Sequence, residues 1–263
     1  MNQHTFDLSQ VEFSRNDIRL GIKVPEYLTE ELAYFLGFHV GDGFMTILRR
    51  GSTVDYRLSY DGHAINEILQ YEEVLKPLIK CLFNKEVTPK KVTQGTITIY
   101  IYSKAIVTFL ENCCGIPLSP KRDIDIPQII KNSSLEIKAH FLRGLADTDF
   151  SLTFHREVYP RINYVTYSKN LHESVKILLQ ELGFIFYSGT MHRKRNETKI
   201  ISHQIDINGK KNLEKWMNIV GFSSYNTLTR YAVWKETGSL SRGTDINERI
   251  KILKERRINS PPL

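Results

Sequence analysis

Two aspartates, Asp42 and Asp149, each lie near the end of a nine-residue motif, and the two motifs resemble each other. Residues 35–43 read FLGFHVGDG, and residues 142–150 read LRGLADTDF. Each motif is largely apolar before its aspartate and predicts a helix that leads directly into a strand. Carboxylates at two such junctions could share divalent cations, because hard cations prefer oxygen ligands. Such a site would suit hydrolysis of a phosphodiester bond.

The electrostatics of helix ends favour a metal site at these junctions. The last carbonyl groups of a helix have no partners within it and carry partial negative charge. An aspartate at that end is unfavourable, and two such ends side by side repel each other unless a cation offsets the charge. We therefore expect Mg²⁺ to be bound by Asp42 and Asp149 with backbone oxygens of Gly41 and Thr148. For a single aspartate of this kind, the alternative is a cap or turn residue.

The similarity between the two parts of the chain extends beyond the motifs. The interval of 107 positions that separates the two aspartates also separates Tyr60 from Tyr167, at similar strand ends. An interval of 106 positions separates Gly115 from Gly221, where each repeat would close. Self-similarity at a fixed interval is typical of a duplicated unit. The alternative is an accidental likeness of two apolar helices, which does not account for three matching points.

Hydrophobic spacing and turn residues predict the same order in both halves: helix, hairpin, helix, hairpin, helix. Thr29 can cap the first helix, and Ser133 with Glu136 forms a capping box for the second motif helix. The first half is expected to have helices at 29–41, 65–83 and 105–114 and strands at 44–48, 56–60, 87–92 and 96–102. The second half is expected to have helices at 137–148, 171–182 and 213–220 and strands at 151–155, 162–167, 185–192 and 200–207.

The chain is therefore expected to be an α+β protein of two pseudo-symmetric αββαββα halves. The expected division is an N-terminal half at 1–116, a linker at 117–132, a C-terminal half at 133–222 and an extension at 223–263 with one helix at 245–256. Small residues along one helix stripe let two backbones approach closely. Because such a stripe recurs, we expect the motif helices to pack on each other and to set the aspartates side by side. The stripe consists of Ala33, Gly37 and Gly41 in one helix and His140, Gly144 and Thr148 in the other.

The composition is that of a globular protein with a polyanionic partner. The 263 residues are 41% hydrophobic, enough for a full core, and carry a formal net charge of +7. The three cysteines lack zinc-ligand spacing and fit a reducing compartment. We find no signal peptide or membrane-length apolar run. The expected location is therefore the cytoplasm, with nucleoid association through DNA, or an organelle matrix.

The motifs and the repeat resemble the LAGLIDADG homing endonucleases, in the single-chain form that carries two motifs. The resemblance covers about residues 29–222, including the element order and the linker. It implies that the motif helices form the central interface and that Asp42 and Asp149 bind the catalytic metal. It implies Mg²⁺ as the cofactor, with Mn²⁺ able to replace it and Ca²⁺ supporting binding without cleavage. It also implies a saddle of two four-stranded antiparallel sheets that sits in the major groove of double-stranded DNA.

Four positions depart from the family pattern. The first motif has Leu36 where alanine is usual and Val40 where an acid is frequent. The second motif has Arg143 where alanine is usual and Phe150 where glycine or serine is usual. Both terminal acids are kept, so the resemblance implies an active nuclease.

Supporting residues are expected outside the motifs. Lys104 and Lys210 precede the last helix of each half and could offset transition-state charge, or be ordinary solvated lysines. Tyr60 and Tyr167 lie where the family often has a polar residue near the attacking water. Basic and amide side chains on strands can contact phosphates or base edges, although outward strand residues are polar in any protein. The expected DNA contacts are Arg49, Arg50, Arg57, Lys90, Lys91, Gln94, His155, Arg161, Arg193, Lys194, Arg195 and Gln204.

Three functions are compatible with the sequence. The expected one is a site-specific double-strand DNA endonuclease of intron homing that acts as a monomer. The alternatives on the same scaffold are an intron RNA-splicing maturase and a DNA-binding regulator that does not cut. The two intact aspartates favour cleavage over regulation, whereas nothing separates the nuclease from the maturase. An intein is not expected, because the sequence lacks the nucleophile at its start and the His-Asn pair at its end.

Overall fold

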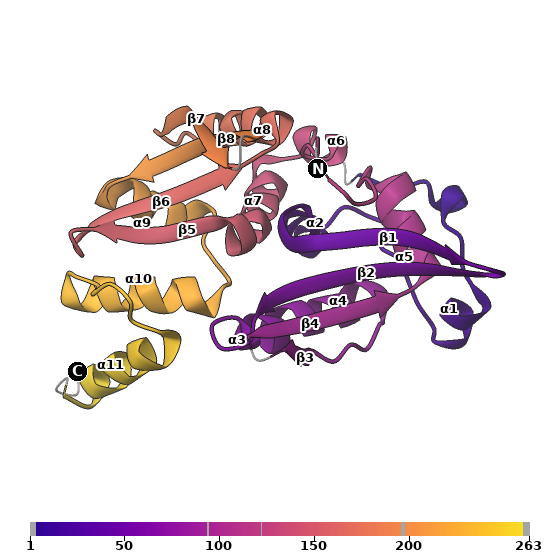
Figure 1. Ribbon diagram of the computed structural model, residues 1–263, viewed down its shortest axis with the longest axis horizontal. Helices are drawn as coiled ribbons and strands as arrows, with labels where there is room; N and C mark the ends of the chain where they lie inside the picture. The colour runs from indigo at the N-terminus through magenta and orange to yellow at the C-terminus, as the bar shows by residue number, and fades with distance from the viewer. Residues whose placement is uncertain (1–3, 94, 122, 196–197, 260–263) are drawn as a thin grey trace.

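Two four-stranded antiparallel sheets flank a central pair of helices. The computed structural model describes residues 4–93, 95–121, 123–195 and 198–259. The strand orders are β1-β2-β4-β3 and β5-β6-β8-β7, so the two sheets have the same topology. Figure 1 shows the motif helices, α2 (Glu30–Asp42) and α7 (Leu135–Asp149), side by side between the sheets. The predicted α+β fold of two pseudo-symmetric halves is confirmed.

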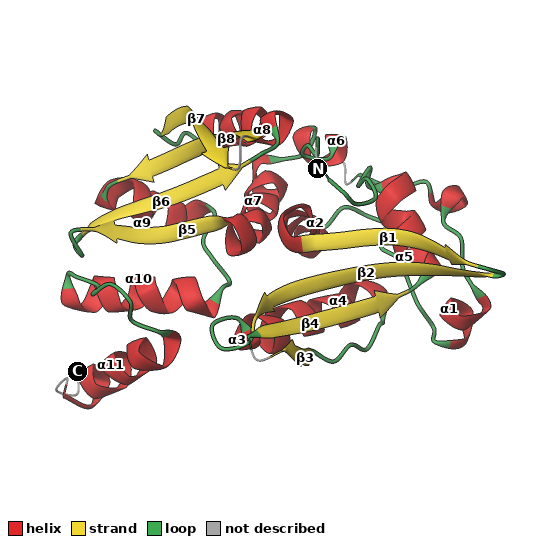
Figure 2. Cartoon of the chain, in the orientation of Figure 1, coloured by secondary structure: helices red, strands yellow, loops and turns green. Residues whose placement is uncertain are grey.

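The first half follows the predicted order of elements (Figure 2). Its middle helix begins as α3 (Ile68–Gln70), widens into a π-helical segment at Tyr71–Leu75 and continues as α4 (Lys76–Phe83). Pro77 lacks an amide hydrogen, which accounts for the irregular turn just before α4. Its last helix is α5 (Lys104–Thr108), extended by a π-helical turn at Phe109–Cys113. The strands are β1 (Gly43–Arg50), β2 (Thr53–His63), β3 (Lys90–Thr93) and β4 (Thr96–Tyr102).

The second half repeats this arrangement, but its register corrects one predicted correspondence. Gly43 pairs with Tyr60 in the first sheet, and Phe150 pairs with Tyr164 in the second. The counterpart of Tyr60 is therefore Tyr164 rather than Tyr167, because the first hairpin of the second half has shorter strands than that of the first half. The elements are β5 (Phe150–His155), β6 (Tyr159–Thr166), α8 (Lys169–Glu181), β7 (Tyr187–Arg195), β8 (Thr198–Asn208) and α9 (Lys210–Ile219).

The motif helices pack with their backbones in contact. A Cβ atom added to Gly37 would clash with the carbonyl oxygen of Phe141, and one added to Gly144 would clash with that of Tyr34. The two contacts are related by the interval of 107 positions, so they are one contact repeated by the pseudo-two-fold axis. The predicted small-residue interface is therefore present, and any side chain at either glycine would force the helices apart.

The C-terminal extension contains two helices, α10 (Tyr225–Thr237) and α11 (Ile246–Asn259), where only one was predicted. Figure 1 places α10 beside the edge strand β5. Trp234 of α10 stacks on Phe154 of β5 at 5.5 Å between ring centroids, and its indole donates to Val158 O at 2.7 Å. Short helices that were not predicted lie at α1 (Arg15–Arg19) and α6 (Gln128–Lys131). Within the described residues, no helix has the length and apolarity needed to cross a bilayer.

Candidate active site

The structure brings Asp42 and Asp149 together at the ends of the paired motif helices. Each aspartate is the last residue of its helix, directly before the first strand of its sheet. Gly41 lies against Thr148, and a Cβ added to Gly41 would stand 3.5 Å from Asp149 Cγ. Among the described residues, no hydrogen-bond donor engages either carboxylate. Their oxygens are therefore available to an external cation.

Burial and mutual repulsion act on these carboxylates. The pKa of Asp42 is raised to about 7, mainly by burial and also by the charge of Asp149. The charges of Glu67 and Asp61 act in the same direction, and that of Lys121 acts against them. Burial also raises the pKa of Asp149 to about 6. Asp42 keeps solvent-accessible surface although protein atoms crowd it, so a cation can reach it from outside. A divalent cation would relieve the repulsion that a proton otherwise relieves.

The two aspartates fit a hard cation whose remaining ligands come from outside the protein. Asp42 and Asp149 supply carboxylate oxygens, the ligands that Mg²⁺ and Ca²⁺ prefer. In the part of the chain that is described, no three His, Cys, Asp or Glu side chains converge as a preformed cage. Mg²⁺ is commonly held by one or two carboxylates together with water and substrate phosphates. The two aspartates therefore suit a metal that binds with its substrate.

Lys121, from the linker, is the cationic partner of this site, and the sequence reasoning missed it. Its Nζ donates to the carbonyl oxygens of His39 at 2.7 Å, Val40 at 2.9 Å and Gly41 at 3.3 Å. These carbonyls end α2, where the helix carries partial negative charge. Burial lowers the pKa of Lys121 to about 8, while the charges of Asp149 and Asp42 raise it. The Gly41 carbonyl, expected to bind metal, thus accepts a hydrogen bond from Lys121.

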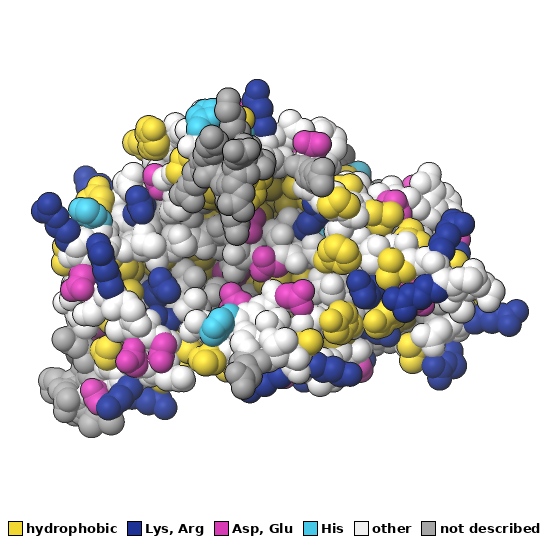
Figure 3. Space-filling model, in the orientation of Figure 1, with side chains coloured by type: hydrophobic (Ala, Val, Ile, Leu, Met, Phe, Trp, Pro, Cys, Tyr) yellow, Lys and Arg dark blue, Asp and Glu magenta, His cyan; other side chains and the backbone are white. Residues whose placement is uncertain are grey.

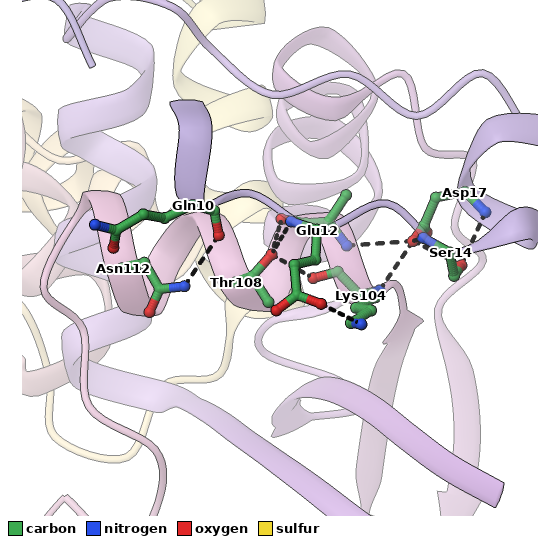
Figure 4. A network of polar contacts seen from close by, with 8 residues as sticks. Gln10, Glu12, Ser14, Asp17, Lys104, Thr108 and Asn112 are labelled. Carbon is green, nitrogen blue, oxygen red and sulfur yellow. Dashed lines mark hydrogen bonds and ion pairs between the residues drawn. The ribbon is translucent and has the colours of Figure 1, made fainter. Parts of the chain in front are cut away.

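Lys104 is not brought to the aspartates. β4 runs antiparallel to β2, so its last residue, Tyr102, lies at the end of the sheet remote from Asp42. Lys104 follows this remote end, and its Nζ pairs with Glu12. Figure 4 shows Lys104 within a polar network that connects the N-terminal segment to α5. Its role is to fix that segment.

Lys210 has the equivalent place in the second half. It begins α9 directly after β8, at the sheet end remote from Asp149. Its exposed ammonium group lies 3.9 Å from Glu214. The expectation that Lys104 and Lys210 support catalysis does not hold in this structure, because each follows a strand that runs away from the motif.

Two further acids lie near Asp42 on the first half alone. Asp61 follows Tyr60 on β2 and accepts a 2.5 Å hydrogen bond from Thr98 Oγ1. Glu67 accepts a 2.5 Å hydrogen bond from the backbone nitrogen of His63. Figure 3 shows acidic side chains gathered in the hollow between the two halves. In the second half, the residue after Tyr164 is Val165, so the site is asymmetric.

The tyrosines expected near the attacking water do not reach it. Tyr60 is fully buried, and its hydroxyl lies 2.8 Å from His39 Nδ1 beneath the first motif. Tyr167 is 72% exposed beyond the end of β6. Asp61, which was not predicted, is the polar residue of β2 beside Asp42. The alternation of side chains along β2 could have predicted this, because Tyr60 points to the core face of the sheet and Asp61 to the opposite face.

Comparison with known proteins relates the second half to a family and most of the chain to a known fold. A family model described as a LAGLIDADG-like domain matches residues 136–221, which include the second motif. The homing endonuclease I-DmoI in complex with DNA and Ca has the same fold, with a TM-score of 0.56 and 17% identity over 79% of this chain and 98% of that one. The complex of I-DmoI with DNA and Mn matches with a TM-score of 0.54 and 18% identity, over 74% of this chain and 97% of that one. The second half thus matches a LAGLIDADG-like domain, and the chain has the fold of the homing endonuclease I-DmoI.

Curated relatives of this chain come from Methanocaldococcus jannaschii, and their names are unrelated to endonucleases. A probable translation initiation factor IF-2 is 26% identical over 232 residues, which are 84% of this chain and 18% of the relative. A glutamine–fructose-6-phosphate aminotransferase is 23% identical over 209 residues, which are 80% of this chain and 18% of the relative. The chain thus spans less than a fifth of either relative. Their names describe whole proteins of which it matches a small part.

The register of the strands shows on which face of its sheet each expected DNA contact lies. Helices cover one face of each sheet, and alternate strand residues point to the other. Arg49 and Lys91 lie on the helix-facing side of their strands, so alternation does not support them as contacts. Gln94 and the side chains of Arg193, Lys194 and Arg195 lie outside the described residues. The contacts on the face away from the helices are Arg50, Arg57, Lys90, His155, Arg161 and Gln204.

An aromatic group surrounds Arg57 on this face, and the sequence reasoning missed it. The Arg57 guanidinium stands 5.8 Å from the ring centre of Phe44 and 6.0 Å from that of Tyr100. Tyr100 in turn stacks on Tyr102 at 6.5 Å, and all three rings are more than 40% exposed. Aromatic surface of this kind is suited to flat or methyl-bearing partners.

Proposed function

We propose that this chain is a site-specific endonuclease that hydrolyses both strands of duplex DNA with a divalent metal. The observation that carries the proposal is the pairing of Asp42 and Asp149, one from each half, at adjoining helix ends. Their oxygens have no hydrogen-bond donor among the described residues, and Figure 3 shows acidic side chains gathered in the hollow between the two halves. One carboxylate from each half suits a substrate with two strands to cut.

The residues of the chain have distinct roles in this proposal. Asp42 and Asp149 hold the cation, and Mg²⁺ bound there would activate water and stabilise the leaving oxygen. Lys121 neutralises the end of α2 and keeps a positive charge beside the site. Asp61 is placed to accept a hydrogen bond from water near Asp42. Mn²⁺ should replace Mg²⁺, and Ca²⁺ should support binding without cleavage.

The DNA partner follows from the arrangement of the sheets. Arg50, Arg57 and Lys90 on one sheet, and Arg161 and Gln204 on the other, point away from the helices and toward the substrate side. Cationic groups there would neutralise phosphates, and the amide would contact base edges. Because one chain supplies both halves, the active form in the proposal is a monomer. Intron homing is the expected biological setting.

Selection from a randomised duplex library tests the proposal. The protein is incubated with Mg²⁺ for cleavage and with Ca²⁺ for binding, and the recovered sequences are read. We expect one long target with a defined cut site. Asp42→Asn and Asp149→Asn should each abolish cutting by at least about 10³-fold while Ca²⁺-supported binding stays within a few-fold.

Other outcomes distinguish the alternatives. Unchanged cleavage in both variants would refute the assignment of the aspartates. Specific duplex binding without cutting in any metal would indicate a regulator. Binding to a structured intron RNA, with no action on DNA, would indicate a maturase.

A further inference from the structure

A cationic pocket lies between the second sheet and the C-terminal extension, outside the paired aspartates. Its volume is about 530 Å³. One wall is formed by β5 and β6, and the other by α10, α11 and the loop between them. Asn66, from the first half, also lines it. Lys and Arg side chains stand over this part of the molecule in Figure 3.

Four arginines line this pocket with little acidic compensation. They are Arg161, Arg230, Arg242 and Arg249. Within the described residues, Arg161 has a carboxylate within ion-pair distance, Asp206 at 3.8 Å, and the other three arginines have none. Arg230 donates only to the carbonyl oxygen of Leu152, at 3.4 Å. Burial lowers the pKa of Arg230, as expected for a cation without a counter-ion.

Arg249 lines the pocket, and hydrogen bonds hold its side chain in place. Its side chain is almost fully buried and donates to Thr229 Oγ1 at 3.0 Å, to Asn226 Oδ1 at 2.5 Å and to the carbonyl oxygen of Thr244. All of these partners are neutral. Burial and the nearby charge of Arg230 together lower the pKa of Arg249 to about 10, against the charges of Asp245 and Glu248, which raise it. A buried and a half-buried guanidinium group, both with neutral hydrogen-bond partners, favour an anion from outside.

The acid in the pocket wall is already engaged. The Asp245 carboxylate accepts from the backbone nitrogens of Asn247 at 2.8 Å and Glu248 at 2.9 Å, which caps α11. It is therefore committed to the helix start rather than to an arginine. The side chain of Arg242, on the exposed loop, has no partner among the described residues. The pocket thus presents fixed and free guanidinium groups together.

We propose that this pocket binds a phosphate group, supplied by the backbone of the bound nucleic acid. Guanidinium groups match phosphate oxygens in geometry and charge. The pocket shares Thr153, His155 and Arg161 with the sheet face that points away from the helices, so a strand lying on that face can continue into it. The inference rests on the proposed function, and it makes the extension part of the binding surface.

The test compares charge removal inside and outside the pocket in the full chain. Arg242→Gln and the pair Arg230→Gln with Arg242→Gln remove pocket charge. Lys254→Gln removes the same charge from an exposed position of α11 that does not line the pocket. The affinity for the selected duplex is measured in Ca²⁺ over a series of salt concentrations. Thermal stability in inorganic phosphate is measured against chloride of equal ionic strength.

Arg242→Gln should weaken duplex binding several-fold and reduce the slope of log affinity against log salt by about 1, and the double variant by about 2. Phosphate should stabilise the wild type and the Lys254→Gln control, but not the double variant. Equal salt slopes in the control and both pocket variants would overturn the proposal, even if phosphate binds, because the backbone would then not be the source. If the wild type binds no duplex, the proposed function fails, and pocket-dependent phosphate stabilisation would still support the phosphate chemistry.

Discussion

At the scale of single residues, the site depends on how charge is arranged at the end of α2. Asp42 adds negative charge to a helix end that is already negative, and Asp149 adds more from the partner helix. Lys121 compensates by donating to the last three carbonyls before Asp42. Because the lysine binds backbone oxygens, the carboxylate oxygens stay available for metal.

Replacing Lys121 with methionine should lower cleavage by about 10²- to 10³-fold, because a cation beside the reacting phosphate is lost. Duplex affinity in Ca²⁺ should change by only a few-fold. Single-turnover cleavage rates measure the effect. The matched control is Lys104→Met, which removes a lysine remote from the aspartates and should leave the rate unchanged. A larger loss in the control than in Lys121→Met would contradict the assignment.

Cleavage should depend on pH with a bell-shaped profile. The pKa of Asp42 is raised to about 7 and that of Asp149 to about 6, and metal binding requires both to be ionised. The rate at limiting Mg²⁺ should therefore rise through pH 6–7. It should fall above about pH 8 as Lys121 loses its proton. In Lys121→Arg the alkaline fall should disappear, because arginine keeps its charge; a flat wild-type profile would refute this account.

At the scale of elements, the contact between α2 and α7 determines whether the aspartates meet. Gly37→Ala places a methyl group against the Phe141 carbonyl and should destabilise the protein by about 1–3 kcal/mol. Urea unfolding measures the loss. Gly95→Ala is the control, because no atom lies within 4 Å of the added methyl. An unchanged stability of Gly37→Ala would mean that the helices are not in backbone contact.

The start of α10 is held to the motif helices by Asp147. Its carboxylate accepts from Tyr34 Oη at 2.7 Å and from the backbone nitrogens of Ser223 at 3.0 Å and Ser224 at 2.9 Å. Asp147→Ala leaves these donors without a partner and should cost roughly 1–3 kcal/mol of unfolding free energy. A double-mutant cycle with Tyr34→Phe measures the part of this free energy that comes from the hydrogen bond between Tyr34 and Asp147. Strict additivity of the two changes would show that the hydrogen bond between them contributes nothing.

At the scale of the whole molecule, the two halves share a fold but not their supporting residues. Lys121, from the linker, binds only the end of α2 in the first half. Asp61 belongs to the first half, and the equivalent position in the second half is Val165. We therefore expect the two DNA strands to be cut at different rates. A supercoiled plasmid that contains the target should first be converted to a nicked circle. The amount of nicked circle should be several-fold higher than expected if both strands were cut at the same rate. Direct conversion to linear DNA, without that intermediate, would contradict the asymmetry.

The sequence alone predicted those features that depend on hydrophobic periodicity or on the internal repeat. The element order of both halves and the pairing of α2 with α7 through Gly37 and Gly144 followed from spacing alone. The predictions for Lys104, Lys210 and Tyr167 failed because each assumed that equal repeat positions have equal surroundings. Lys104 and Lys210 follow strands that run away from the motif, and Tyr167 lies beyond the end of its sheet.

Only the tertiary structure decided what joins the aspartates. Lys121 has no repeat counterpart and lies in a linker, so local pattern gave it no weight. The helix of the extension that was not predicted, α10, is held by the packing of Trp234 on Phe154, a residue 80 positions away in the chain. Local propensity and periodicity act over a few residues and are written in the sequence. Charge compensation at a shared site arises only when distant segments meet, which the fold as a whole determines.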